Sequence, residues 1–206
     1  MKGSTHILGG VTMAISLTAM AGIYLPEVSH ATIEWSSVGS FCLYISGAST
    51  GSVLPDIEKK GSTISNKHKF ISLLSRCICS HRGITHSLLA LCVVGALLFP
   101  FALLIPSGYG YAYMTGVLIG YGSHLLLDSL NPTGVPFFYP FSETKFSFAK
   151  IKTGGFVEWL FSILLGILLF MICRFSLYDK LLALNLPEQA TNIVNTAKQH
   201  LPGLSW

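Results

Sequence analysis

The chain has 206 residues, of which 51% are hydrophobic and only 11% are charged, and its net charge is +4. Ordinary soluble domains carry about 25% charged residues, so the composition indicates a protein solvated by lipid and excludes a typical soluble enzyme. The positive charge does not predict nucleic-acid binding, because the basic residues lie in short segments between apolar ones, where membrane topology accounts for them.

Five apolar segments follow one another, each near the roughly 20 residues needed to cross a bilayer. They are Ile7–Leu25, Val38–Leu54, Ile84–Ile105, Tyr111–Leu130 and Phe156–Phe175. Small and polar residues at 46–52 in the second segment are typical of a helix packed closely against other helices. We therefore predict an all-α membrane protein, with about five transmembrane helices in one domain, residues 1–175. The first segment has a second interpretation as a signal peptide, because Lys2 precedes it and residues 19–21 resemble a cleavage site.

Basic residues predict the orientation of these helices. With five crossings, ten of the thirteen fall on one side: Lys2, Lys59, Lys60, Lys67, Lys69, Arg76, Arg82, Lys145, Lys150 and Lys152. The connections on the other side, residues 26–37 and 106–110, contain no Lys or Arg. By the positive-inside rule the basic side is cytoplasmic and contains the N-terminus.

Two segments outside the apolar ones are also predicted to be helical. Residues 67–80 mix basic and apolar side chains, a pattern that is typical of a helix lying along the inner membrane surface. The tail, residues 176–206, is predicted to form an amphipathic helix on the outer side. The five cysteines show no spacing that completes a zinc site and no disulfide framework.

The topology brings metal-binding residue types to the cytoplasmic side from four helices. His6 starts the first helix, Asp56 and Glu58 follow the second, His81 and His86 flank the start of the third, and His124 and Asp128 end the fourth. Because these segments are distant in sequence, their convergence predicts a metal site.

His124 and Asp128 are spaced i, i+4, so both lie on one helix face inside an apolar span, where ionisable groups usually face a cavity or a partner. The pair can bind a divalent cation, or the carboxylate can bridge two cations. The alternative is a private hydrogen bond between the two side chains that locks the helix to a neighbour.

The helix starts nearby carry further candidates. Thr85 is a suitable N-cap for the third helix, which would place His86 in its first turn, and Thr5 would cap the first helix beside His6. Arg82 suits a site that also holds an anion such as phosphate, the alternative being a snorkelling arginine at the interface.

Asp56 and Glu58 are two residues apart. In an extended loop this spacing sends their side chains to opposite sides, so we expect Asp56 to bind the metal. Glu58 would be a further ligand, a support for a ligand or a general base.

These motifs resemble a known family. The resemblance rests on five stretches of this chain, which follow one another over roughly residues 1–140. They are Thr5-His6, Leu54-Pro55-Asp56-x-Glu58, His81-Arg82-Gly83-x-Thr85-His86-Ser87, Gly120-x-x-x-His124-x-x-x-Asp128 and Asn131-Pro132-Thr133-Gly134-Val135. Together they are similar to the LexA-regulated, inner-membrane predicted metal-dependent hydrolases. The resemblance implies a bacterial inner-membrane location, a link to the SOS response and metal-assisted hydrolysis.

The hypothesis that follows is metal-assisted hydrolysis of a phosphoester or lipid-linked phosphate at the cytoplasmic leaflet, with membrane lipid as the partner. The expected metal ligands are His6, Asp56, His86, His124 and Asp128, holding one or two divalent ions. Zinc is favoured over manganese or magnesium because imidazoles outnumber carboxylates among the candidates. The expected catalytic residues are Glu58 for proton transfer, Arg82 for negative charge on the substrate, and His81, which completes the site.

Two other functions fit the same residues. A metal-ion or proton transporter needs ionisable residues through the whole membrane, yet the outer halves of the segments are nearly free of them. A non-enzymatic stress-response protein with a structural metal normally closes its site with four ligands, whereas the larger number of candidates here leaves room for water and substrate.

Overall fold

The computed structural model describes residues 1–22, 28–29, 32–33, 35–58, 83–106 and 108–177. Within these ranges the chain forms five α-helices: α1 (Gly3–Ala21), α2 (Trp35–Gly51), α5 (Leu88–Leu104), α6 (Tyr109–Asp128) and α7 (Phe156–Ile172). A 3-10 helix, η1 (Leu54–Glu58), follows α2, and a π-helical turn, η2 (Cys173–Leu177), extends α7. Two short antiparallel strands, β1 (Val28–Ser29) and β2 (Thr32–Ile33), lie between α1 and α2. The predicted all-helical fold is confirmed apart from this small hairpin.

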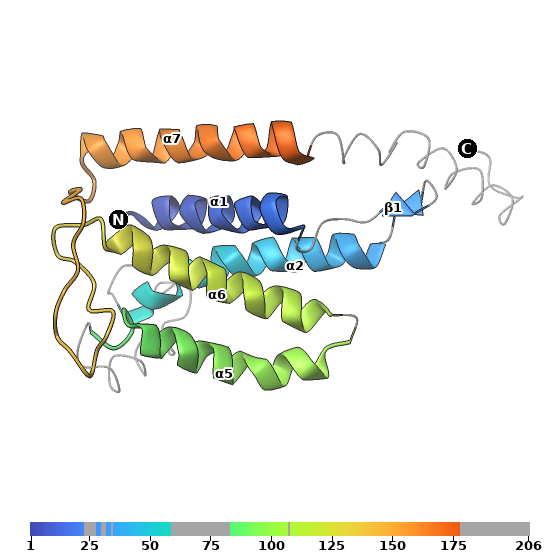
Figure 1. Ribbon diagram of the computed structural model, residues 1–206, viewed down its shortest axis with the longest axis horizontal. Coiled ribbons are helices and arrows are strands. Elements are labelled where there is room, and N and C mark those ends of the chain that lie inside the picture. Colours follow the sequence, from blue (N-terminus) through green and yellow to red (C-terminus); the bar gives the residue numbers. More distant parts are fainter. Residues whose placement is uncertain (23–27, 30–31, 34, 59–82, 107, 178–206) are drawn as a thin grey trace, which may run out of the picture.

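The five helices lie side by side with alternating directions (Figure 1). The starts of α1, α5 and α7 and the ends of α2 and α6 therefore meet at one end of the bundle, together with η1. We call this the polar end. Helix α6 is central and packs against α1, α2 and α5, while α7 packs against α1 from the outside.

Glycines allow α2 and α6 to approach closely. A Cβ atom on Gly47 or Gly51 of α2 would collide with backbone atoms of α6, and one on Gly116 or Gly120 of α6 would collide with the backbone of α2. Each helix thus presents two glycines one turn apart, the small-residue pattern of closely packed membrane helices. The close packing predicted for residues 46–52 is confirmed.

The outer helices expose apolar side chains over much of their length. Helix α7, described in full, buries only Glu158, and α5 buries only Ala102. A soluble monomer rarely exposes apolar patches of this size, and lipid is the solvent that suits them. Among the described residues two helices are long and apolar enough to cross a membrane, α1 and the helix from Phe156 to Phe175, while the apolar α5 is shorter.

Three predictions about local structure are wrong. The N-cap of α1 is Lys2 rather than Thr5, which lies inside the helix. The N-cap of α5 is Ser87, whose extended backbone lets its side chain accept a hydrogen bond from Ala90 N at 3.2 Å, so Thr85 is not the cap and His86 precedes the helix. Asp56 lies in η1 rather than in an extended loop. The helix predicted at 67–80 and the tail beyond residue 177 lie outside the described residues.

The glycine contact can be tested with two matched substitutions on α6. A Cβ at Gly120 would lie 2.8 Å from the carbonyl carbon of Ala48, whereas a Cβ at Gly122 meets nothing within 4 Å. Overpacking of this kind costs about 1–3 kcal/mol, so we expect Gly120→Ala to lower the free energy of unfolding by that amount. Gly122→Ala should leave it unchanged or raise it by up to about 1 kcal/mol, because alanine favours helix. Thermal unfolding in detergent measures both, and equal effects would contradict the proposed contact.

Candidate metal centre

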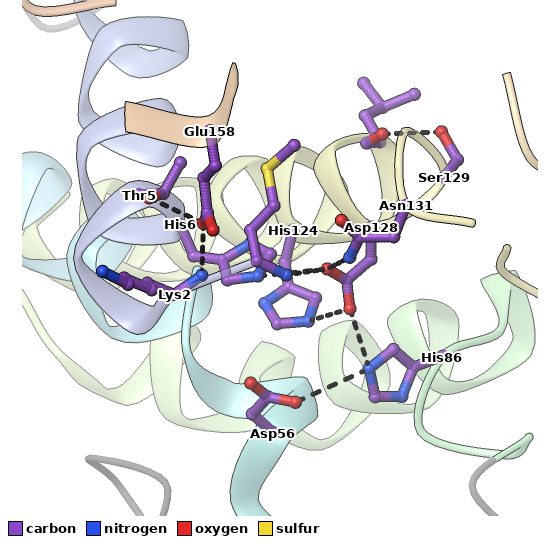
Figure 2. A network of polar contacts seen from close by, with 12 residues as sticks. Lys2, Thr5, His6, Asp56, His86, His124, Asp128, Ser129, Asn131 and Glu158 are labelled. Atoms are coloured by element: carbon purple, nitrogen blue, oxygen red, sulfur yellow. Dashed lines mark hydrogen bonds and ion pairs between the residues drawn. The ribbon is translucent and has the colours of Figure 1, made fainter. Parts of the chain in front are cut away.

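Four side chains with metal-binding groups converge at the polar end (Figure 2). They are Asp56 from η1, His86 from the segment before α5, and His124 and Asp128 from the last turns of α6. One ligand atom of each lies within 4.8 Å of the others. The convergence expected from the sequence is present, and these four residues form what we call the His–Asp cluster.

The spacing of the donor atoms suits a metal ion. Asp128 Oδ2 lies 3.5 Å from His124 Nε2 and 3.6 Å from His86 Nε2, and His86 Nε2 lies 3.8 Å from Asp56 Oδ1. A tetrahedral zinc ion with bonds of about 2.0–2.1 Å separates its ligand atoms by roughly 3.4 Å. These three distances are within a few tenths of an ångström of that value, and all four donors lie within 4.8 Å of one another.

The ring of His124 shows which of its nitrogens can bind a cation. This ring is fully buried, and its Nδ1 lies 2.7 Å from the backbone oxygen of Ser52. Because a carbonyl only accepts hydrogen bonds, Nδ1 carries the proton, and Nε2 turns its lone pair toward Asp128. Nε2 has no hydrogen-bond partner among the described residues. Two acceptor atoms therefore face each other in a buried place, which a cation between them would stabilise.

The predicted i, i+4 arrangement of His124 and Asp128 on one helix face is confirmed. His124 Nε2 lies 3.5 Å from Asp128 Oδ2, and the same oxygen lies 3.6 Å from His86 Nε2, so the contact is not private to His124 and Asp128.

Asp128 is held in place through its other oxygen. Asn131 Nδ2 donates to Oδ1 at 2.7 Å, the amino group of Met1 lies 2.8 Å from it, and His6 Nε2 lies 3.2 Å away. Oδ1 thus faces donors while Oδ2 faces the two histidines of the cluster. The sequence placed Asn131 in a motif without giving it a role, and its i+3 spacing from Asp128 was the available signal.

His6 lies beside the cluster rather than in it. Its ring is fully buried and stacks on that of His124, with centroids 3.8 Å apart and an interplanar angle of 15°. Its Nδ1 and Nε2 form no hydrogen bond with a described residue. The structure brings His6 against Asp128 but does not include it among the four mutually close donors.

The three predicted catalytic residues are not placed by the structure. Glu58 is the last residue of η1, but its side chain lies outside the described part of the chain, as do His81 and Arg82. Their roles stay predictions from the sequence.

Glu158 is a buried acidic residue that sequence reasoning missed. Its Oε1 accepts hydrogen bonds from Lys2 N and, at 3.0 Å, from Thr5 Oγ1, while Oε2 accepts one from Gly154 N. These bonds fasten the start of α7 to the start of α1, the helix that carries His6 (Figure 2). The signal was a single carboxylate in the first turn of an otherwise apolar helix, where the helix dipole favours negative charge.

A cavity of about 420 Å³ opens beside the cluster. His86 and Asp128 form part of its wall, and Thr133, Tyr139, Glu143 and Lys145 line it from residues 129–155, which we call the α6–α7 connection. A small molecule in this cavity would touch two members of the cluster. Sequence reasoning did not assign these connection residues to a site, and it used Lys145 only for topology.

The fold and the cluster define a helical membrane protein with a potential metal centre at one end of its bundle. The chain belongs to the family described as YdjM inner membrane protein, which it matches over residues 1–186. This confirms the expected inner-membrane family.

Curated relatives agree with that family. The chain is similar to "Inner membrane protein YdjM" of Escherichia coli (strain K12) and of Shigella flexneri, each 42% identical over 90 residues, which span 43% of this chain and 44% of the relative. It is also similar to "Uncharacterized protein YvsG" of Bacillus subtilis (strain 168), 31% identical over 160 residues, or 78% of this chain and 86% of that protein. No solved structure matches.

Metal content tests the cluster directly. We expect purified protein to bind about one divalent ion per chain, and His86→Ala and His124→Ala to lose most of it, because each removes one of four donors. His6→Phe keeps a ring stacked on His124 and should retain the metal with affinity lowered about 10-fold, as substitutions behind a ligand typically do. Elemental analysis and metal titration measure these effects.

The control for this experiment is Glu143→Gln, which removes a carboxylate near the cluster but outside it. Equal metal content in all variants, or loss in Glu143→Gln as large as in His124→Ala, would contradict the assignment.

Proposed function

We propose that this protein is a membrane-embedded, metal-dependent hydrolase that acts on a phosphoester or a lipid-linked phosphate at the cytoplasmic leaflet. The observation that carries this proposal is the buried, unpartnered Nε2 of His124 facing Asp128 Oδ2 next to an open cavity. Buried polar atoms normally have partners, so this pair indicates a bound cation. The cavity supplies what a hydrolase needs in addition, a place for substrate at the same cation.

One ion fits the described donors better than two. Asp128 Oδ1 already faces the side-chain amide of Asn131 and the ring of His6, which leaves Oδ2 for a metal. Two imidazoles and two carboxylates suit zinc or manganese, whereas magnesium and calcium prefer oxygen ligands alone. Among the described donors imidazoles and carboxylates are equal in number, because His6 lies outside the four.

The residues of the site divide the work of hydrolysis. A divalent ion held by the cluster would supply a Lewis acid and lower the pKa of a water molecule toward about 7. His86 and Asp128 belong both to the cluster and to the cavity wall, so a substrate in the cavity would lie next to the cluster. Arg82 would stabilise negative charge on the substrate, Glu58 would transfer protons, and His81 would complete the site.

The proposal includes a multi-pass topology with five crossings and a cytoplasmic N-terminus. Its support is the alternating direction of the helices and the distribution of basic side chains. Among the described residues, Lys2, Lys145, Lys150 and Lys152 lie at the polar end, and Arg174 follows α7 at the opposite end. The positive-inside rule then makes the polar end cytoplasmic. Helix α1 contacts α2, α6 and α7 and carries His6, which favours a retained helix over a cleaved signal peptide.

A structural metal site is the second candidate, because four donors are the number with which such a site normally closes. The cavity at His86 and Asp128 argues against closure, since it leaves the cluster open on one side. A transporter lacks support, because the described histidines and carboxylates gather at the polar end instead of continuing along the bundle.

Hydrolysis is tested with full-length protein loaded with zinc or manganese and offered a panel of phospholipids and isoprenoid phosphates. We expect turnover that a chelator abolishes and that His124→Ala lowers by about 100-fold or more, because activated water depends on the ion. Released phosphate or released alcohol is the measurement. Metal bound stoichiometrically, with no turnover on any substrate, would favour the structural site.

Orientation is tested with reporter fusions. We expect alkaline phosphatase to be active when fused after residue 108, between α5 and α6, and inactive when fused after residue 152, because only the first position is extracytoplasmic. A fluorescent protein that folds in the cytoplasm should give the reverse pattern. An active phosphatase after residue 152 would contradict both the topology and the cytoplasmic site.

A further inference from the structure

The α6–α7 connection contains no helix, but backbone hydrogen bonds hold it in a defined conformation. Val135 and Phe146 form a two-residue antiparallel pair, each donating a backbone hydrogen bond to the other at 3.0 Å. Phe148 N donates to Ser129 O at 2.8 Å and Ile151 N to Leu130 O at 2.7 Å, which return the connection to the end of α6. Long connections without secondary structure are uncommon in compact domains and usually carry function.

A further contact fixes this connection against the cluster. Leu88 is the first residue of α5 and lies two residues after His86. Its backbone N–H donates to Phe137 O at 2.9 Å. The side of the cavity formed by residues 133–145 is thereby held at a set distance from His86. Gly83 lets the ring of Tyr139 approach, since a Cβ there would lie 3.0 Å from it.

We propose that the cavity between the His–Asp cluster and the α6–α7 connection binds a phosphate group, and that Lys145 determines its affinity for this anion. The inference rests on the proposed function, because it assigns the anionic part of the substrate to the space beside the same metal centre. Lys145 is the basic side chain among the described residues that line the cavity, and it forms no ion pair with any described residue. An ammonium group is a strong donor to phosphate oxygens.

The charges around the cavity make this assignment specific. With a divalent ion bound, the carboxylates of the cluster would be neutralised, and among the described residues of the wall the other charged side chains are Lys145 and Glu143. Lys145 attracts an anion and Glu143 repels it. Removing the two charges therefore changes phosphate affinity in opposite directions. The comparison with Lys152, which lies outside the cavity wall, separates a contact in the cavity from general surface charge.

Aromatic residues on the same connection indicate that the phosphate belongs to a lipid. Phe141 is 88% exposed and Phe138 is 53% exposed, and both lie within the segment that forms the cavity wall. Exposed aromatic rings at the polar end of a membrane bundle are typical of side chains at the headgroup level. Phosphate of a headgroup and free phosphate share the same chemistry, and the experiment separates them.

The experiment uses full-length, metal-loaded protein in phosphatidylcholine nanodiscs, titrated with inorganic phosphate by calorimetry. We expect Lys145→Met to weaken binding about 10-fold, since a hydrogen bond to a charged group is lost. Glu143→Gln should strengthen binding. Lys152→Met, an exposed lysine of the same connection outside the cavity wall, should change the affinity less than about twofold, since exposed charges are screened.

A second arm replaces part of the phosphatidylcholine with phosphatidic acid. If the cavity takes a lipid headgroup, phosphatidic acid in the bilayer will compete with added phosphate in the wild type and lose most of that effect in Lys145→Met. If phosphatidic acid does not compete with added phosphate, although Lys145→Met still weakens phosphate binding, the cavity takes a soluble phosphate compound.

Two results would overturn the inference: no phosphate binding by the metal-loaded wild type, or equal weakening by Lys145→Met and Lys152→Met. Its failure is distinct from that of the proposed function. Normal metal content and turnover without an effect of Lys145 would remove only this inference. Lys145-dependent phosphate binding without any hydrolysis would remove the hydrolase and leave the phosphate site in place.

Discussion

The close approach of α2 and α6 is the contact on which the rest of this structure depends. Gly47 and Gly51 on one helix and Gly116 and Gly120 on the other leave no room for a side chain between the two backbones. Lipid gives no hydrophobic reason for two apolar helices to associate, so close packing of this kind is a main source of their affinity. The contact also determines where α2 ends relative to α6, and the site lies at that point.

The contact between α2 and α6 affects the candidate metal ligand His124 through one backbone carbonyl group. Ser52 directly follows α2, and its backbone oxygen faces His124 Nδ1 at 2.7 Å. A backbone oxygen cannot donate, so the proton of the imidazole is held on Nδ1 and the metal-binding nitrogen is left free toward Asp128. A change in helix packing would therefore alter the state of a ligand as well as its position. Asn131 has a comparable effect on Asp128, because it occupies one carboxylate oxygen and leaves the other to the histidines.

The fold and the cluster could be predicted because they depend on local patterns. The length of the apolar segments predicts the helices, and their alternating directions bring His86 and His124 to one end of the bundle. Contacts that depend on tertiary structure could not be predicted. Thr85 and Ser87 are equally good caps by residue type, and only the backbone that connects to Phe137 decides between them. In the sequence Lys145 indicates only the orientation of the helices. Its place on the cavity wall depends on how the α6–α7 connection folds.

The side chains at the polar end depend on one another for their positions. Charged groups near lipid are costly, and the described carboxylates of Asp128 and Glu158 face complementary groups. Two of the three hydrogen bonds that Glu158 accepts fasten α7 to the start of α1, and α1 carries the His6 ring that stacks on His124. Removing any one member leaves another buried polar group without a partner. A cation in the cluster would therefore stabilise the folded state as well as serve the chemistry, because it would add positive charge between Asp56 and Asp128.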